Sequence, residues 1–239
     1  MKQILLLLVL LFSLEQCHGG EPRNILVAGF DSAALSRAIG ESQAGDSVEL
    51  PAGTYTITEP IAPRSGTRLL GAGQDKTVVN FAGAKPDVML RLTEREDVEI
   101  SHLTLDAQNN ANVSQGIAGG NSRRLKLHHL TIRNLAKSKT FGPHAILFSG
   151  SSPGRERGVC DSEVSDCLIE NIAPDASFGC GIRFSWGSSR NRILRNTVRN
   201  TGRGGIFGDN GSTDLLIRGN TVSGSDGEGL GIEVWERCD

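Results

Sequence analysis

Short alternations of apolar and polar residues recur along the chain and set its structural pattern. A period of two predicts β-strands rather than helices. One set of apolar positions is Ile100, Leu127, Val164, Ile193 and Ile217, and a second set follows at Leu105, Ile132, Ile169, Val198 and Val222. A third set is Ile117, Ile146, Ile182, Ile206 and Ile232, at spacings of 29, 36, 24 and 26 residues.

Repeats of this length predict a solenoid in which each turn is one rung of short strands. Each strand then pairs in parallel with its copy in the next rung, at about 4.8 Å, so equivalent side chains stack in inward columns. Asn196 and Asn220 fall at a predicted turn, where Asn tolerates the left-handed conformation and can bond the next Asn. The sequence therefore predicts an all-β parallel β-helix.

Two further segments make this prediction more specific. The stretches "AGDSVELPAGTYTI" (44–57) and "GTRLLGAGQDKTVVNF" (66–81) resemble right-handed parallel β-helix proteins of the pectin-lyase-like superfamily, above all the rhamnogalacturonase/epimerase-type pectate lyase domain. The resemblance covers residues 25–239. It implies a short helix over the N-terminal end of the coil, and "DSAALSRAIGES" fits, with Asp31 as N-cap and one apolar face. That face contains Ala34, Leu35, Ala38 and Ile39.

Composition and termini add a cellular context. The formal charge is −2, with 25 basic and 27 acidic residues, which argues against a nucleic-acid partner. Residues 1–20, "MKQILLLLVLLFSLEQCHGG", have the form of a secretory signal peptide, so we expect a secreted, periplasmic or cell-surface protein without a membrane segment after cleavage. The sequence stops at "WERCD" in an incomplete rung, which favours a fragment lacking further rungs or a partner over that end.

An exported chain meets oxidising conditions, so its cysteines are candidates for disulfides. Four remain after cleavage and allow three pairings. We expect Cys167 to pack in the core as a small apolar residue. The four are Cys160, Cys167, Cys180 and Cys238.

The resemblance implies that substrate lies along the outer face of the strands that carry the third apolar set. Because side chains alternate along a strand, the residues after each Ile point outward. These are Ala118, Leu147, Arg183, Phe207 and Glu233, followed two residues later by Ser185, Asp209 and Trp235.

Asp209 and Glu233 are the candidate catalytic carboxylates. Their Cα atoms are expected roughly 8 Å apart from the rung spacing, which overlaps the separation of about 6.5–9.5 Å in inverting glycosidases. The alternative is that outward charges are solvated and that Asp209 belongs to the turn "GDNGSTD". A lyase would instead use His144 as base and Arg183 to neutralise a substrate carboxylate, although a lone His is more often structural.

Residues that would bind the sugar surround these candidates. Trp235 and Phe207 offer rings for stacking, and Arg203 and Glu228 lie on loops entering the same strands, as do Lys137 and Lys139. No metal-ligand spacing occurs, and "DNGSTD" has too few ligands for a dedicated Ca²⁺ site, so Ca²⁺ is only a weak cofactor candidate.

The sequence favours an exported lyase or glycoside hydrolase acting on an acidic polysaccharide or oligosaccharide. Arg pairs with a carboxylate, aromatic rings stack on sugars, and carboxylates serve acid–base steps. The alternative is a non-catalytic carbohydrate-binding or surface-structural β-helix, because the superfamily contains both kinds. The paired-Asp and Gly-His-Gly motifs of polygalacturonases are absent from the sequence.

Overall fold

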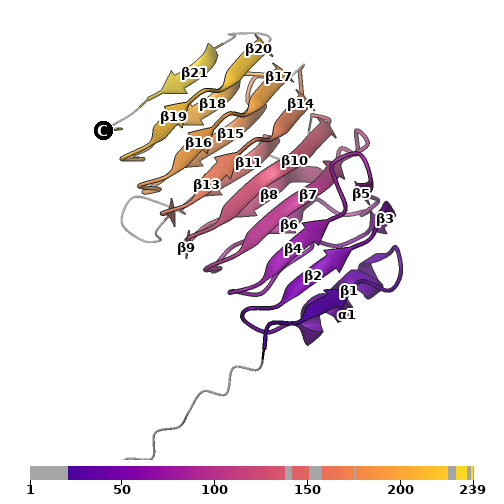
Figure 1. The fold of residues 1–239 in the computed structure, drawn as a ribbon. Coiled ribbons are helices and arrows are strands. Elements are labelled where there is room, and N and C mark those ends of the chain that lie inside the picture. The colour runs from indigo at the N-terminus through magenta and orange to yellow at the C-terminus, as the bar shows by residue number, and fades with distance from the viewer. Residues whose placement is uncertain are drawn as a thin grey trace, which may run out of the picture.

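The chain forms a right-handed parallel β-helix of about seven turns, with its rungs stacked from the N-terminal to the C-terminal end (Figure 1). The computed structural model describes residues 21–137, 142–150, 158–174, 176–225, 230–235 and 238, with the backbone only at residue 230. The predicted signal peptide at 1–20 lies outside the described residues. The predicted fold class is confirmed.

Two parallel sheets and one short ladder make up the described part of the coil. The larger sheet contains β1 (Asn24–Leu26), β2 (Ser47–Leu50), β3 (Gly53–Ile57), β4 (Arg68–Gly71), β5 (Thr77–Phe81), β7 (Glu99–Asp106), β10 (Lys126–Leu135), β13 (Glu163–Ser165), β14 (Leu168–Ile172), β16 (Arg192–Leu194), β17 (Thr197–Thr201), β19 (Leu216–Arg218) and β20 (Thr221–Ser225). The smaller sheet contains β6 (Asp87–Arg91), β8 (Val113–Gly119), β11 (His144–Ser149), β15 (Cys180–Ser185), β18 (Gly204–Gly208) and β21 (Leu230–Val234). The ladder joins β9 (Ser122–Arg123) to β12 (Val159–Cys160).

The three predicted apolar columns are present in the strand register. Leu127 pairs with Ile100 and Val164, and the pairing continues through Ile193 to Ile217. The other two columns are aligned in the same way, from Leu105 to Val222 and from Ile117 to Ile232. Most of these side chains are fully buried, so the repeating apolar positions build the core.

Helix α1 (Ser32–Glu41) lies at the N-terminal end of the coil, as the resemblance implied (Figure 1). Its Asp31 carboxylate accepts a hydrogen bond from the backbone N–H of Ala34 at 2.8 Å, which satisfies one of the unpaired donors of the first turn. Its buried residues are the four predicted ones. In the part of the chain that the structure describes, no helix has the length and apolar character needed to span a bilayer.

The rungs turn at three columns of residues with positive φ. One column alternates aspartate and arginine, all with φ of 53–55°. Each of its arginines donates hydrogen bonds to the aspartate of the preceding rung. A second column contains three asparagines whose amides bond along the ladder, from Asn200 to Asn171 at 2.7 Å and from Asn171 to Asn134 at 3.2 Å. The charged column contains Asp97, Arg124, Asp161, Arg190 and Asp214, and the third column contains His102, His129, Asp166, Arg195 and Gly219.

The structure corrects the prediction for Asn196 and Asn220. The left-handed residues are Arg195 and Gly219, one position earlier. Asn196 is instead buried inside the corner, where its side chain accepts from the backbone N–H of Cys167 at 3.0 Å and donates to the carbonyl of Val164 at 2.9 Å. The predicted bond between the two asparagines is present, with Asn196 donating to Oδ1 of Asn220 at 3.0 Å.

The buried Cys167 is arranged for packing rather than for reactivity. Cys160, Cys167 and Cys180 are free thiols. Cys167 is buried in the core as predicted, and burial raises the pKa of its thiol to about 12. A thiol with so high a pKa stays protonated and is a poor nucleophile.

Removing the Asn196 amide tests the internal Asn bonds. Asn196→Ala leaves a buried N–H of Cys167 and a buried carbonyl of Val164 without partners, so we expect a loss of about 2–4 kcal/mol in the free energy of unfolding. Denaturant unfolding measures it. The control Asn200→Gly removes an exposed ladder amide without straining a left-handed position and should cost no more than about 1 kcal/mol. Equal losses of unfolding free energy in both variants would contradict the stabilising role of the internal Asn196 hydrogen bonds.

Candidate functional site

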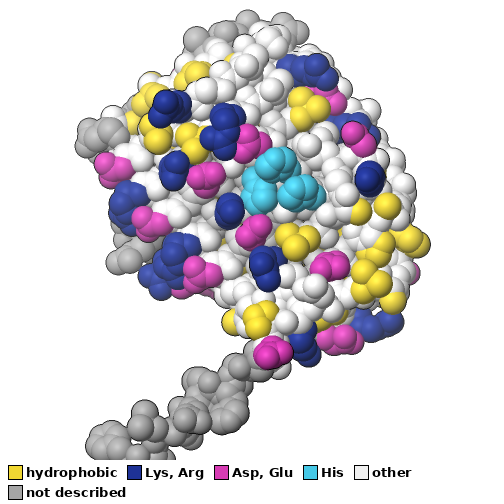
Figure 2. All heavy atoms as spheres, in the orientation of Figure 1, with side chains coloured by type: hydrophobic (Ala, Val, Ile, Leu, Met, Phe, Trp, Pro, Cys, Tyr) yellow, Lys and Arg dark blue, Asp and Glu magenta, His cyan; other side chains and the backbone are white. Residues whose placement is uncertain are grey.

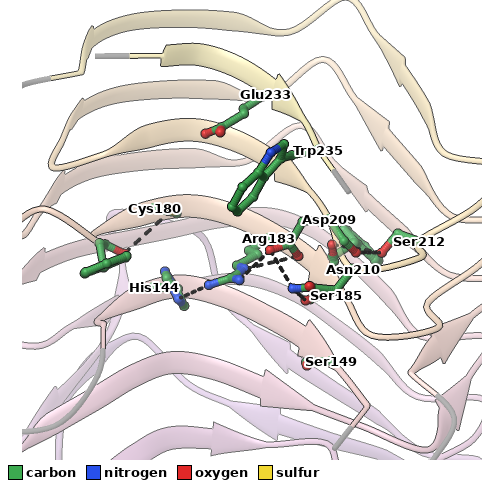
Figure 3. Close-up of polar contacts among 12 residues, drawn as sticks. His144, Ser149, Cys180, Arg183, Ser185, Asp209, Asn210, Ser212, Glu233 and Trp235 are labelled. Carbon is green, nitrogen blue, oxygen red and sulfur yellow. Dashed lines mark hydrogen bonds and ion pairs between the residues drawn. The ribbon is translucent and has the colours of Figure 1, made fainter. Parts of the chain in front are cut away.

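Unlike side chains stack on the outer face of the smaller sheet, in the rungs of β15, β18 and β21 (Figure 3). The register aligns Leu147 with Arg183, Arg183 with Phe207, and Phe207 with Glu233. The register therefore aligns the residues of the predicted outward column. Because unlike groups follow one another at the rung spacing, charges and an aromatic ring come into direct contact.

Arg183 of this column forms a buried ion pair with Asp209, which lies two residues after Phe207. Nη2 of Arg183 donates to Oδ2 of Asp209 at 2.5 Å, and Nε donates to Oδ1 at 3.4 Å. Asn210 donates a further hydrogen bond to Oδ2 at 2.9 Å. The Asp209 side chain is only 1% exposed, so its carboxylate is neutralised and enclosed rather than open to solvent.

His144 completes this cluster from the start of β11. Nε2 of His144 lies 3.3 Å from Nη1 of Arg183. A guanidinium only donates, so Nε2 accepts and the neutral ring holds its proton on Nδ1. Burial, reinforced by the Arg183 charge, lowers the pKa of His144 from 6.5 to about 3. The imidazole is therefore neutral at neutral pH.

A second ion pair lies one rung further along the coil. Nη2 of Arg203 donates to Oε1 of Glu233 at 3.1 Å, and both side chains are largely shielded. The Arg203 guanidinium lies 5.1 Å from the ring centroid of Phe207 and 5.7 Å from those of Phe178 and Trp235. Among the residues that the structure describes, Nε of Arg203 and Oε2 of Glu233 are buried without a hydrogen-bond partner.

Of the two aromatic rings predicted to stack on a sugar, Trp235 is exposed but Phe207 is buried. Phe207 is 1% exposed, because guanidinium groups of Arg183 and Arg203 each lie 5.1 Å from its ring centroid. The expectation that Phe207 stacks on a sugar is therefore wrong for this arrangement. Trp235 is 50% exposed and keeps an accessible ring beside the ion pairs. Figure 3 shows its ring between Glu233 and Asp209.

Two residues of the site were missed by sequence reasoning. Phe178, 45% exposed, contacts Arg203 from the loop before β15, and an aromatic residue in a loop already assigned to this face was the available signal. Cys180 is buried beside the charged groups, and burial raises the pKa of its thiol to about 11. No sequence pattern distinguishes such a cysteine from one in the core.

The remaining predicted residues lie elsewhere or are not described. Glu228, proposed to bind substrate, and Lys139 lie outside the described residues. Lys137 lines a hollow of about 500 Å³ beside the Asn ladder, together with Leu135 and Pro174. Within the described residues, no group of three or more His, Cys, Asp or Glu side chains is arranged to hold a metal ion.

The fold and this outer face define the class of protein as a parallel β-helix with a polar site on one sheet. Residues 28–233 match the family described as rhamnogalacturonase A/epimerase, pectate lyase-like. The chain belongs to this family. Comparison with curated protein sequences finds no match.

Solved structures with the same fold include enzymes and an adhesin. The A-module of a mannuronan C-5 epimerase from Azotobacter vinelandii aligns over 85% of this chain with a TM-score of 0.62 and 18% identity; the chain spans 58% of that module's length. An alginate lyase from Paenibacillus aligns over 89% of this chain and 74% of its own, with a TM-score of 0.63 and 16% identity. PfbA, a surface adhesin of Streptococcus pneumoniae, aligns over 82% of this chain and 62% of its own, with a TM-score of 0.51 and 19% identity. At these identities the likeness is one of fold.

The buried, neutral state of His144 predicts a dependence of stability on pH. Between its unfolded pKa of 6.5 and its folded pKa of about 3, the unfolded chain binds one more proton, so stability falls as pH falls through this window. The slope reaches about 1.4 kcal/mol per pH unit. Denaturant titration from neutral to acidic pH measures the unfolding free energy of wild type and of His144→Gln. The slope of this free energy against pH should be smaller in His144→Gln by up to that amount. A wild-type slope in His144→Gln would refute the prediction.

Proposed function

We propose that the protein is an exported lyase that cleaves an acidic polysaccharide at the outer face of β15, β18 and β21. The observation that carries this proposal is the position of two guanidinium groups, Arg183 and Arg203, each 5.1 Å from the ring centroid of Phe207, with the half-exposed ring of Trp235 next to Arg203. The pectate lyase-like family supports an acidic glycan as the substrate class. Export rests on the predicted signal peptide at 1–20.

Arg203 is the group that neutralises the substrate carboxylate. It donates one hydrogen bond to Glu233 and its side chain is 19% exposed, while Arg183 is held in two bonds by Asp209 and is 14% exposed. A carboxylate pairs with a guanidinium through short, directional hydrogen bonds. Neutralising the carboxylate acidifies the proton on the adjacent sugar carbon, and the Trp235 ring offers a stacking surface for the sugar.

Glu233 is the better-placed base. Its side chain is 13% exposed and is bonded through Oε1 to Arg203, whereas His144 is fully buried and its Nε2 accepts from Arg183. In the proposed step the Glu233 carboxylate takes the proton beside the neutralised carboxylate of the substrate. The C–H electrons form a carbon–carbon double bond, and the neighbouring glycosidic C–O bond breaks. The leaving sugar oxygen takes up a proton, which gives one unsaturated end and one new reducing end.

Hydrolysis by a pair of carboxylates has less support. It requires one carboxyl to protonate the leaving group and the other to activate water or attack the sugar. Asp209 is enclosed and is bonded to both Arg183 and Asn210, so it is unavailable for either role. In this proposal Asp209 fixes the orientation of Arg183 instead.

The second candidate function is carbohydrate binding without catalysis. Both carboxylates of the site are ion-paired, which favours a rigid recognition surface. One solved structure of the same fold is described as a surface adhesin. Binding would use Arg203 and Trp235 in the same way but would leave the glycan intact.

Product analysis separates these functions. The protein is incubated with alginate, pectate and neutral polysaccharides, with and without Ca²⁺, while ultraviolet absorbance of unsaturated uronates and reducing ends are followed. We expect both signals to rise together on a polyuronate. Reducing ends without absorbance would indicate hydrolysis. Retention on immobilised polyuronate with neither signal, from protein shown to be folded, would favour the binding function.

Glu233→Gln tests the role of the base. It keeps the size and one acceptor of the side chain but removes its basicity, so we expect turnover to fall about 10²–10⁴-fold with polyuronate binding retained. The matched control is Glu170→Gln, since Glu170 also accepts from an arginine one rung along, Arg199, but on the larger sheet. Glu170→Gln should keep wild-type turnover. Unchanged turnover in Glu233→Gln would remove this residue from the mechanism.

A further inference from the structure

Three histidines form a cluster on the larger sheet, on a different face from the candidate site. Figure 2 shows them as one group near the centre of the face formed by the strands from β4 to β16. His102 and His129 occupy the same corner position in successive rungs, with φ of 59° and 51°, and their rings stack at 4.9 Å with an angle of 4°. His128 meets both rings edge-on.

The hydrogen bonds of the cluster fix which nitrogens hold protons. Nε2 of His128 lies 3.0 Å from a carboxylate oxygen of Glu99, and a carboxylate only accepts, so this nitrogen donates. The Nδ1 atoms of His128 and His129 lie 2.9 Å apart. In the neutral cluster His129 therefore donates from Nδ1 to the lone pair of Nδ1 on His128, and a single proton lies between the two nitrogens.

We propose that His128 and His129 form a binding site for one divalent transition-metal ion, with Cu²⁺ preferred, in which the ion replaces the shared proton between the two Nδ1 atoms. In the metal-bound state the single proton of His129 lies on Nε2 instead of Nδ1, so both imidazoles stay neutral and no net proton is released. Within the described residues no third His, Cys, Asp or Glu is placed to share the ion, so water completes its coordination.

The separation of the two nitrogens fits an ion that binds its ligands at right angles. Metal–imidazole bonds are about 2.0–2.1 Å long, so two of them at a right angle place their nitrogens about 2.9 Å apart. This matches the observed 2.9 Å. A tetrahedral angle would require about 3.3 Å with the same bonds. Right angles are the geometry of Cu²⁺ and Ni²⁺ with nitrogen and oxygen ligands, and imidazole affinity is highest for Cu²⁺ among the first-row divalent ions.

Glu99 and the ring stack prepare the two ligands. A metal-bound imidazole commonly donates its other N–H to a carboxylate, which fixes its tautomer and increases its basicity, and Glu99 makes this contact to His128. The His128 side chain is 13% exposed and that of Glu99 is 30% exposed, so the bond is partly shielded from water. His102 covers one face of the His129 ring by stacking and supplies no ligand.

Titration with Cu²⁺ alone tests the site. Full-length protein without a histidine tag is titrated at neutral pH by calorimetry, and electron paramagnetic resonance records the hyperfine pattern of bound nitrogen. We expect one ion per chain with two imidazole nitrogens, and weaker binding of Ni²⁺ and Zn²⁺. His129→Gln should weaken Cu²⁺ binding at least tenfold, and Glu99→Gln should weaken it about tenfold through the loss of the supporting carboxylate.

His102→Phe is the matched control, because it keeps an aromatic ring on His129 without a nitrogen. It should bind Cu²⁺ with near wild-type affinity and an unchanged resonance spectrum. Circular dichroism and metal-free melting establish that each variant is folded. Failure of the wild type to bind Cu²⁺, binding unchanged in His129→Gln, or equal loss in His102→Phe would each overturn the proposed two-nitrogen site.

Discussion

Parallel pairing between successive rungs is the constraint on which the rest of this structure depends. A side chain at one position lies directly over its equivalent about 4.8 Å away, so neighbours along a column are decided by the repeat and not by local sequence. Inside the coil this requirement selects apolar residues, as in the column from Ile117 to Ile232. At the corners it selects residues that tolerate a left-handed backbone or gain partners by stacking, as Asn134, Asn171 and Asn200 do.

The same constraint builds the candidate site out of unlike residues. Arg183, Phe207 and Glu233 are stacked by register, and the loop residue Arg203 joins them from the side. Two guanidinium groups lie against the Phe207 ring, and each has its own carboxylate, which offsets the repulsion between them. The alternation of side chains along the strands would leave these charged groups exposed to solvent. Because they pair with and cover one another, this face is polar but its charged side chains are largely shielded from water.

The fold and the outer column could be predicted from the sequence because both follow from periodicity. The N-cap at Asp31 followed from a local hydrogen bond. The prediction failed where a side chain's surroundings depend on loops. Asp209 points to the outer face, but Asn210 and Arg183 enclose it, and Phe207 is covered by an arginine from the turn before β18. The left-handed corner was misplaced by one residue at Asn196, because Asn is favoured both at such positions and as an internal bridge between rungs.

The charged corner column has a consequence for how this coil can change in length. Its members alternate strictly, from Asp97 through Arg124, Asp161 and Arg190 to Asp214, so the pattern repeats every two rungs rather than every one. A tandem duplication of a single rung within it would set acid on acid or base on base, at a spacing where like charges repel. Duplicating a pair of rungs would keep every contact favourable. Duplication of an even number of rungs within this column is therefore less destabilising than duplication of an odd number.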